Sequence, residues 1–509
     1  MRRTWRVVSA LLVLLSLGLT PGCSSDDGSG GTTGPPEIAS TETMVDWIAE
    51  IVDQGIRRPG YAADQWVETW ARDRFEEFGL QDVTLDPIDV LRWEPHSWSL
   101  EVWREDEPER VVSIPSYPVP MTAEVAGLEA ELVLAGEDDH AALAGRIAVV
   151  ENHFIQLPQR GTDVFATWSY DPANEFDTLV QTLPFGPGFQ DVMEPAIEAG
   201  ALGFIGILRG LPWDTDRYYV PYDGLERPVP GLWLSSRNGD TLLELMADGP
   251  VRARIVLNRS LEPAISHNVT ATLPGMSDQW IIIGSHHDAP WASAVEDGTG
   301  IALVMAQAQY WSQVPRAERP HNLMFLLNGG HMSGGAGLIH FVESNRDFLE
   351  RDVLVEIHLE HAAAEARGDD GVLVATDKPE PRWWFTSFIP SLEQAVADAI
   401  CEHELERSFV MPPEGFPPGS ANPPTDAAFF HPWAPIVSFL TAPMYLFDEA
   451  DTIEMVHQPS LVPLSRATID IVNAMATETA ATLRAQIYAP PRATPLRCAS
   501  EADSEEVTR

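Results

Sequence analysis

The chain has 509 residues, 44% of them hydrophobic, which is enough for two or three domains with sizeable cores. Its 76 acidic residues outnumber its 32 basic residues and give a formal net charge of −44 at pH 7. Proteins bind nucleic acids through clustered lysines and arginines, so this balance argues against a nucleic-acid partner. A heavily solvated acidic surface explains the charge more simply than a function that depends on it.

The first residues have the pattern of a bacterial lipoprotein signal peptide. Basic residues precede an apolar run over 7–19 that is too short to span a membrane and that leads to Cys23. We expect residues 1–22 to be a signal peptide, Cys23 to be lipidated after cleavage, and 23–40 to be a flexible tether. The protein is then exported and lipid-anchored to the cell envelope, in the outer membrane if the cell has one. An ordinary secretory signal with an incidental cysteine is the alternative.

Two further cysteines, Cys401 and Cys498, remain after that cleavage. In an oxidising compartment they could form a disulfide, but nothing in the sequence fixes the distance between them. A disulfide and two free thiols therefore both stay open.

The segment from Thr41 to Gly79 predicts two helices, because its apolar residues recur at helical spacing. Thr41 is the expected N-cap of the first helix, and Gly79 ends the second where a C-terminal glycine belongs. Alternating segments such as 98–103 then predict strands.

Residues 115–262 follow a different order of elements. Strands are predicted at 145–150 and 203–208, and a helix at 238–246. This order resembles the protease-associated domain, a β-rich module without catalytic residues that is often inserted into exopeptidases. The loop over 213–228 could cover a cleft, although an ordinary surface loop is the simpler interpretation.

From His267 onward the sequence alternates between buried strands and long helices. Strands are predicted at 267–273, 280–284, 323–327 and 353–359, and a helix at 299–311. This alternation predicts an α/β domain with a mostly parallel sheet flanked by helices. Reactive loops of such sheets lie at the carboxyl ends of the strands.

Four polar clusters fall at these strand ends or open the following helix: 284–288, 294–300, 328–335 and 358–361. Each has a plain structural explanation when taken alone. Adjacent histidines are commonly polar loop residues, and carboxylates often cap a helix N-terminus. Neither Ser285 nor Ser333 lies in a Gly-x-Ser-x-Gly turn, which argues against a serine nucleophile.

The order of the motifs along the chain is more informative than any one of them. The motifs are NVTATLPG, IIIGSHHD, EDGTGIALVMA, LMFLLNGGH and IHLEH. This run resembles the co-catalytic zinc exopeptidases, which include bacterial leucyl aminopeptidases, aminopeptidase Y and glutamate carboxypeptidase II. The resemblance implies that 41–114 and 263–489 form a peptidase domain around a protease-associated insert at 115–262, with 490–509 as a C-terminal tail. It also implies a peptide substrate and a zinc cofactor, with one or two ions.

That family binds two zinc ions through a His, a bridging Asp, a Glu, a second Asp and a final His, and a further Glu is the general base that activates a water. His286 falls on the first His and Asp288 on its supporting Asp. Glu296 falls on the bridging position and Glu360 on the second Asp, each as a longer carboxylate.

The other family positions do not match. The base and ligand glutamates are replaced by His331 and Met332, and the final His by Ala427. A thioether is a poor zinc ligand and cannot act as a base, and an alanine offers no ligand atom.

Two explanations remain. In the first, additional imidazoles from His287, His331 and His361 rebuild a zinc site, with His331 as a ligand or as the group that moves the proton. In the second, the protein is a non-catalytic lipoprotein that binds peptides or partners in the old cleft. A one-zinc enzyme like the glutaminyl cyclases of this fold is a third, less favoured alternative. The sequence favours an exported, metal-dependent exopeptidase of the aminopeptidase type.

Overall fold

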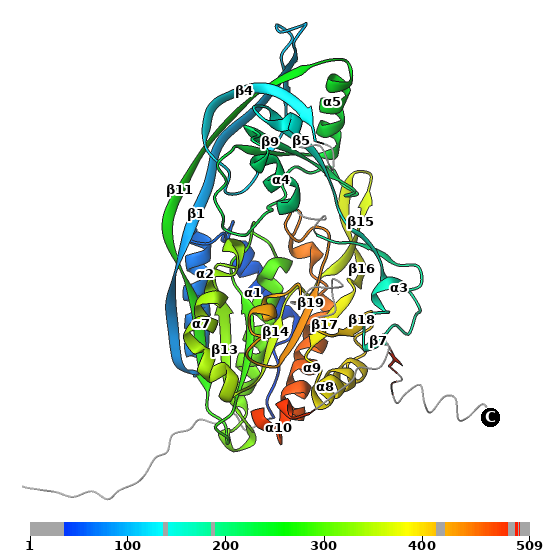
Figure 1. The fold of residues 1–509 in the computed structure, drawn as a ribbon. Coiled ribbons are helices and arrows are strands. Elements are labelled where there is room, and N and C mark those ends of the chain that lie inside the picture. Colours follow the sequence, from blue (N-terminus) through cyan, green and yellow to red (C-terminus); the bar gives the residue numbers. More distant parts are fainter. Residues whose placement is uncertain are drawn as a thin grey trace, which may run out of the picture. The chain divides into compact units, whose positions relative to one another are not determined.

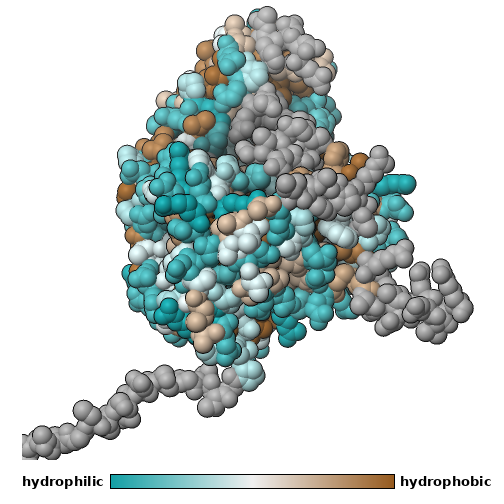
Figure 2. All heavy atoms as spheres, turned by 60° about the horizontal axis from the view of Figure 1, so that its bottom comes forward, coloured by the Kyte–Doolittle hydropathy of each residue, from teal (hydrophilic) through white to brown (hydrophobic). Residues whose placement is uncertain are grey.

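The computed structural model describes residues 35–135, 141–184, 189–413, 423–486, 494–496 and 498. Cys23, the predicted signal peptide and most of the predicted tether and tail lie outside these residues. Within the described chain, no helix is long and apolar enough to cross a bilayer. Hydrophilic residues cover much of the face in Figure 2, in keeping with a composition rich in acidic residues.

Two helices form near the start of the described chain, as their apolar spacing predicts. α1 spans Thr41–Val52, and its N-cap is Ser40, whose hydroxyl accepts a hydrogen bond from a backbone N–H of the first turn. The prediction of Thr41 as the N-cap is therefore wrong by one residue. α2 spans Ala62–Glu77, and Gly79 follows it with a φ of +78°, the left-handed conformation typical of glycine after a helix.

The α/β part of the chain is built on strands that are mostly parallel. Their bounds are β11 Val251–Leu273, β12 Trp280–His286, β13 Asn322–Asn328, β14 Val353–Leu359, β17 Arg382–Thr386, β18 Ser408–Met411 and β19 Ile436–Thr441. β12 pairs in parallel with β13 and β14, and β14 pairs in parallel with β19. β11 and β17 flank this group in antiparallel orientation, and β18 runs parallel to β17. The predicted α/β fold is confirmed.

Helices cover both faces of this sheet (Figure 1). Their bounds are α6 Gly300–Gln313, α7 Ala336–Arg351, α8 Pro390–Glu402, α9 Leu461–Ala474 and α10 Ala480–Arg484. Ile281 and Ile283 of β12 join the core that contains α6, whereas Ile282 joins the core that contains Leu338 of α7. Because both faces are buried, this strand is apolar from Trp280 to Ile283, and its polar residues, Ser285 and His286, come only at its carboxyl end.

A smaller group of strands lies within residues 115–262. Its bounds are β3 Tyr117–Pro118, β4 Val125–Leu134, β5 Ile147–His153, β9 Gly203–Arg209 and β10 Gly231–Leu234, with helices α4 Phe189–Glu198 and α5 Ser236–Ala247. β4, β5, β9 and β10 are parallel and contribute to a hydrophobic core of their own. The long strand β11 pairs with β4 of this group and with β13 of the α/β sheet, and so connects the two. β1, Gln81–Arg104, pairs antiparallel with β11 (Figure 1).

Part of the predicted insert belongs instead to the edge of the α/β sheet. The elements concerned are β6 Gln156–Pro158, α3 Gln159–Thr162, β7 Trp168–Tyr170 and β8 Val180–Thr182. β7 pairs with β18, and Phe176 shares a hydrophobic cluster with Trp383 and Phe409. Segment 115–262 is thus not a single separate body, and its predicted boundaries stay a prediction. The remaining strands are β2 Val112–Ile114, β15 Ala364–Asp369, β16 Val372–Pro379 and β20 Thr494–Pro495.

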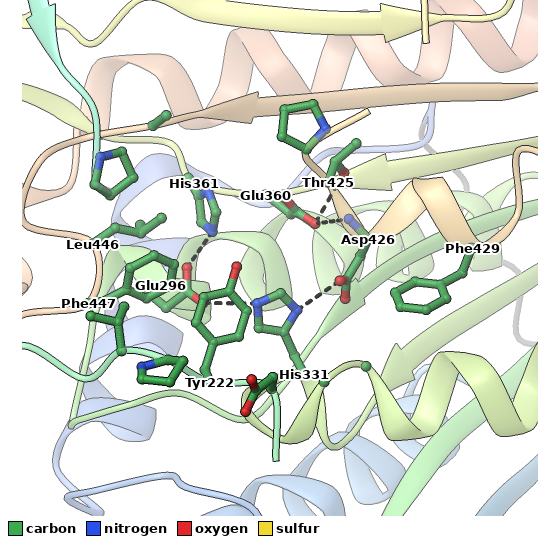
Figure 3. A pocket seen from close by; sticks show the side chains of 18 of the residues that line it. Tyr222, Glu296, His331, Glu360, His361, Thr425, Asp426, Phe429, Leu446 and Phe447 are labelled. Atoms are coloured by element: carbon green, nitrogen blue, oxygen red, sulfur yellow. Dashed lines mark hydrogen bonds and ion pairs between the residues drawn. The ribbon is translucent and has the colours of Figure 1, made fainter. Parts of the chain in front are cut away.

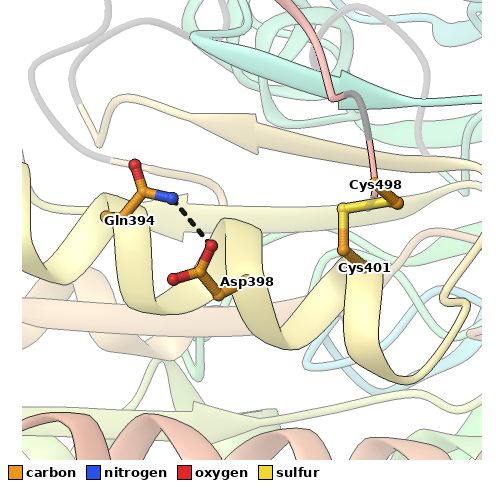
Figure 4. Close-up of a disulfide and its surroundings, with 4 residues drawn as sticks. All are labelled: Gln394, Asp398, Cys401 and Cys498. Carbon is orange, nitrogen blue, oxygen red and sulfur yellow. Dashed lines mark hydrogen bonds between the residues drawn. A yellow bond between two sulfur atoms is a disulfide. The ribbon is translucent and has the colours of Figure 1, made fainter. Parts of the chain in front are cut away.

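Cys401 and Cys498, whose pairing the sequence left open, form a disulfide (Figure 4). Their Cα atoms lie 5.3 Å apart, within the range of native disulfides. The bond ties the C-terminal end of α8 to the segment after β20. Cross-links over long stretches of chain typically stabilise the folded state by about 2–4 kcal/mol.

Candidate metal centre

The predicted polar clusters meet at one edge of the sheet. His286 is the last residue of β12 and lies opposite Asn328, the last residue of β13. His331 follows β13 in a short 3-10 helix, η4, His331–Ser333. His361 follows β14 by two residues. The carboxyl ends of neighbouring parallel strands therefore bring these side chains together, as the topology predicts.

Three imidazoles surround the buried carboxylate of Glu296 (Figure 3 labels three of these four residues). Its Oε1 atom lies 3.5 Å from Nε2 of His286 and 3.7 Å from Nε2 of His331. Its Oε2 atom lies 2.5 Å from Nε2 of His361. The rings of His286 and His331 stack with their centroids 4.0 Å apart. We call Glu296, His286, His331 and His361 the four-residue site.

Each imidazole of the four-residue site is oriented through its other nitrogen. Nδ1 of His286 donates to the backbone carbonyl of Asp288 at 2.9 Å. Nδ1 of His331 donates to Oδ1 of Asp426 at 2.8 Å, and Nδ1 of His361 donates to the carbonyl of Thr441 at 2.9 Å. With the proton on Nδ1, each Nε2 lone pair faces Glu296, which is how a metal-binding histidine is normally fixed.

Several buried atoms of this site lack a hydrogen-bond partner among the described residues. They are Oε1 of Glu296 and Nε2 of His286, while Oε2 of Glu296 and Nε2 of His361 have only each other, at 2.5 Å. Nearly all buried polar side-chain atoms in native proteins have such a partner. Glu296, His286 and His331 each offer a ligand atom, and these atoms lie within 4.8 Å of one another, so one cation would fit between them, whereas His361 contacts the other oxygen of Glu296. Imidazole and carboxylate groups are suitable ligands for zinc.

His361 adopts a left-handed backbone conformation with a φ of +50°. Such strain is unfavourable for a residue with a β-carbon and is commonly found at functional sites. The hydroxyl of Thr441 donates to the carbonyl of His361 at 2.6 Å and holds this conformation. The conformation directs the imidazole toward Glu296.

Nearby carboxylates raise the pKa values of two of the three imidazoles, those of His331 and His361, against the effect of burial. Burial alone would lower the pKa of His331, but Asp426, Glu296 and Asp288 outweigh burial and raise the pKa to about 10. Burial is likewise outweighed at His361, where Glu296 first and Asp297 second raise the pKa to about 10. At His286, burial lowers the pKa well below its usual value, and the charge on His331 adds to that effect. The carboxylates thus favour positive charge at this site.

The loop that carries Glu296 is fixed by two residues that the sequence motifs did not identify. The Arg57 guanidinium is fully buried and donates to four backbone carbonyls of the loop, at 2.9–3.2 Å: those of His287, Ala292, Ser293 and Glu296. The Asp451 carboxylate accepts from the backbone N–H groups of Val295 and Glu296 at 2.8 and 2.9 Å. Both residues position the carboxylate at the centre of the four-residue site.

Asp288 supports the site differently from the family pattern. Its carboxylate accepts hydrogen bonds from the backbone N–H groups of His331 and Met332, at 3.0 and 2.7 Å. It therefore fixes the turn that carries His331, while only its backbone carbonyl orients His286. Met332 packs in the hydrophobic core, so a glutamate there would bury a carboxylate rather than restore a ligand.

Glu360, also predicted as a ligand, contacts a neighbouring cluster instead of the four-residue site. Its Oε1 atom lies 3.1 Å from Nε2 of His358, and it accepts a hydrogen bond from the backbone N–H of Asp426 at 3.4 Å. His358 also bonds Glu356 at 2.8 Å. Burial would lower the pKa of His358, but Glu356 and Glu360 raise it well above its usual value. A protonated His358 thus already provides a positive charge between these carboxylates.

His287, weighed as an additional ligand, lies in a separate buried cluster. Its Nδ1 atom is 3.0 Å from Oδ1 of Asp64, and its Nε2 atom donates to the carbonyl of His267. Asp64 and the neighbouring Glu68 come from α2. His287 therefore links the end of β12 to α2 and takes no part in the four-residue site.

A cavity of about 490 Å³ opens onto Glu296, His331 and His361. Much of its wall is apolar, with side chains such as Trp383, Phe429, Leu446 and Phe447. The other lining residues are Pro184, Val220, Pro221, Tyr222, Asp223, Gly334, Gly335, Glu360, Pro424, Thr425, Asp426 and Ala442. None of the described lining residues is a lysine or an arginine.

Residues 220–223, from the predicted insert, form part of this wall. The interpretation of 213–228 as an ordinary surface loop is therefore wrong, because this loop reaches the site. Burial first, and then the charges of Glu296, Asp426 and Glu360, raise the pKa of Tyr222 above its usual value. Its hydroxyl accordingly stays protonated at neutral pH.

Comparison with known proteins agrees with this geometry. Residues 268–404 match the profile of peptidase family M28. Three solved structures resemble the chain: an aminopeptidase from Aneurinibacillus sp. strain AM-1, a peptidase M28 precursor from Shewanella amazonensis and a zinc aminopeptidase from Bacillus subtilis. Their TM-scores are 0.60, 0.65 and 0.61, at 18%, 17% and 14% identity. The matches cover 90%, 88% and 88% of this chain and 98%, 95% and 98% of theirs. No curated protein sequence matches the chain significantly.

The α/β domain is therefore that of the co-catalytic zinc exopeptidases, as the order of the motifs predicts. Within that fold, residues 268–404, which include β12, β13 and β14, are the part that matches peptidase family M28. At these identities the solved structures establish the fold alone. The chemistry of the divergent site has to be inferred from the residues of this chain.

Proposed function

We propose that this protein is a zinc-dependent aminopeptidase that holds one zinc ion at the four-residue site. The observation that carries this proposal is the convergence of three Nε2 atoms on the buried carboxylate of Glu296, with most of these atoms lacking hydrogen bonds. A zinc ion there would polarise the scissile carbonyl and lower the pKa of a water. The Bacillus subtilis neighbour, described as a zinc aminopeptidase, supports the choice of metal.

One ion fits the described residues better than two. The two family positions that would complete a second site hold Met332 and Ala427, and both side chains lie in hydrophobic clusters. The carboxylates beside them are already compensated: His331 bonds Asp426, and His358 pairs with Glu360.

The lining of the cavity favours the amino end of a peptide. Its charged groups are carboxylates and imidazoles, and the described lining includes no lysine or arginine to pair with a terminal carboxylate. An amino-terminal ammonium group would be attracted to this lining, whereas a carboxyl terminus would be repelled. The apolar wall would accommodate the side chain next to the scissile bond.

The geometry favours His331 as a ligand rather than as the proton acceptor. Its Nδ1–H is bonded to Asp426 and its Nε2 faces Glu296, so both ring nitrogens are occupied by the ligand role. Glu360 also lines the cavity, and its Oε2 atom makes no hydrogen bond to another described residue. We therefore assign proton acceptance to Oε2 of Glu360.

The variants Glu360→Gln and His331→Ala are expected to differ in zinc content. Glu360→Gln should keep the zinc and lower peptide hydrolysis by about 100- to 10,000-fold, the usual worth of a positioned acid–base group. His331→Ala should lose the zinc, because it removes one of the ligands. Metal analysis and hydrolysis of aminoacyl 4-nitroanilides measure both effects. Loss of zinc from Glu360→Gln would instead return Glu360 to the ligand role of the family.

The same assays separate the other two functions. A one-zinc site is also compatible with cyclisation of amino-terminal glutamine, which is measured by release of ammonia from a glutaminyl peptide. A protein that binds peptides without converting them would support the non-catalytic alternative, which the replacements at Met332 and Ala427 favour.

We further propose that the protein is exported and attached to the cell envelope through lipidated Cys23. The apolar run that leads to this cysteine supports the anchor. The disulfide between Cys401 and Cys498 supports an oxidising compartment.

Cys23→Ala is expected to release the protein from the membrane fraction or to block its processing, because no thiol remains to be acylated. Fractionation and the mass of the mature amino terminus measure this result. The double variant Cys401→Ser and Cys498→Ser, which removes the disulfide and keeps Cys23, should leave the attachment unchanged. Unaltered attachment and processing of Cys23→Ala would exclude the anchor.

A further inference from the structure

Tyr222 presents its hydroxyl to the cavity from outside the α/β domain. It lies in the loop between β9 and β10, within the segment predicted to be a non-catalytic insert. No described residue forms a hydrogen bond with its hydroxyl, and Figure 3 shows this group directed toward the side of the cavity that holds Glu296. A hydroxyl without a protein partner beside a reacting group is available to the substrate.

The ring of Tyr222 is held against the four-residue site. It stacks on the imidazole of His331 with the centroids 5.3 Å apart and the planes at 20°. It also packs against the ring of Phe447, and the two ring centroids lie 4.8 Å apart. These contacts fix the direction of the hydroxyl before any substrate enters.

The backbone around Tyr222 is fastened to the turn that carries His331. The N–H of Gly334 donates to the carbonyl of Tyr222 at 2.9 Å. A β-carbon on Gly334 would lie 2.6 Å from the carbonyl oxygen of Asp223, so this approach requires glycine. The Asp223 carboxylate is in turn bonded by Arg227 at 2.5–2.7 Å. A loop with this many attachments can hold a donor in place during a reaction.

The cavity offers one other hydroxyl among its described lining residues, that of Thr425. It shares a hydrogen bond with Ser438 at 2.7 Å. Tyr222 is the one tyrosine of the described lining, so its hydroxyl remains to bind substrate.

We infer that Tyr222 is a catalytic residue supplied by the insert, whose hydroxyl donates a hydrogen bond to the scissile carbonyl oxygen as negative charge develops there. The hydroxyl keeps its proton, so no bond of the tyrosine is made or broken. The inference rests on the proposed peptidase function. It implies that the insert completes the active site instead of only shielding it.

Tyr222→Phe tests this role while keeping the aromatic ring. We expect kcat for aminoacyl 4-nitroanilides to fall by about 100- to 1,000-fold, the usual effect of losing one such donor. Zinc content and thermal unfolding should not change. Leucine phosphonic acid, whose anionic oxygens resemble the charged intermediate, should bind more weakly by a similar factor, while leucine itself binds equally well.

Tyr310→Phe is the matched control, because Tyr310 lies on α6 beside Trp311 and does not line the cavity. An active wild-type protein whose Tyr222→Phe variant retains its kcat and its phosphonate affinity would overturn the inference and leave the proposed function standing. A zinc-loaded wild-type protein that hydrolyses no aminoacyl substrate would overturn the proposed function, and the role of Tyr222 with it.

Discussion

Glu296→Gln is expected to remove most of the zinc from the protein and to lower peptide hydrolysis by on the order of 1,000-fold or more, since even the loss of a residue that merely supports a ligand costs about 10- to 100-fold. Glu296 is the centre of the four-residue site, and its oxygens lie 2.5–3.7 Å from the three Nε2 atoms. The amide is almost isosteric with the carboxylate but carries no charge. Three imidazoles would then have to bind the cation without a counter-charge.

Metal analysis after dialysis and assays of aminoacyl 4-nitroanilides measure this result. Glu454→Gln is the matched control, because it makes the same change at an exposed carboxylate bonded only to Thr452 among the described residues. The control should keep both zinc and activity. A Glu296→Gln protein that still contains a full complement of zinc would show that the metal is held elsewhere.

Arg57→Met is expected to lower the free energy of unfolding by about 4 kcal/mol or more, because each buried polar group left without a partner costs about 1–3 kcal/mol. The substitution removes the donors to four backbone carbonyls of the loop between β12 and α6. A methionine fills part of the volume but donates no hydrogen bond. The loop that carries Glu296 should loosen, so zinc affinity should also fall.

Denaturant unfolding of the zinc-free proteins measures the stability difference separately from metal binding. Arg72→Met is the matched control, since Arg72 lies on α2 and pairs only with its neighbour Asp73 at the surface. The control should unfold like the wild type. Equal stability of the two variants would mean that the bonds of Arg57 contribute nothing measurable.

The sequence predicted the fold and the edge of the sheet where the site lies, because both depend on local patterns. Apolar runs such as 280–284 indicated buried strands, and the polar clusters followed those strands directly. The parallel topology then brings His286, His331 and His361 together. The N-cap of α1 was misplaced by one residue, since Ser40 and Thr41 both have side chains that can cap a helix.

Residues that act from distant parts of the chain could not be identified in this way. Arg57 bonds a loop that lies 230–239 residues away in the sequence, and no motif connects the two. Asp426 directly precedes Ala427 in the sequence. Its contact with His331 depends on the three-dimensional positions of two turns that lie 95 residues apart, which the sequence pattern does not determine. Tyr222 lies in the segment that resembles the protease-associated domain. Because that module has no catalytic residues, the resemblance argued against a catalytic role for Tyr222. The sequence signal available was the adjacent pair Arg57 and Arg58 in a strongly acidic chain; the structure shows that both side chains are buried.

The most direct test of the account is the zinc stoichiometry of the purified, full-length protein after exhaustive dialysis, measured by inductively coupled plasma mass spectrometry. The four-residue site predicts about one zinc ion per chain, since three of its groups, Glu296, His286 and His331, lie within reach of a single ion and leave the fourth tetrahedral position to a water. A value near two would contradict the one-ion site and would place a second ion beside Glu360 and Asp426. A chain that retains no zinc, and takes up none when zinc is added, would contradict the metal centre itself.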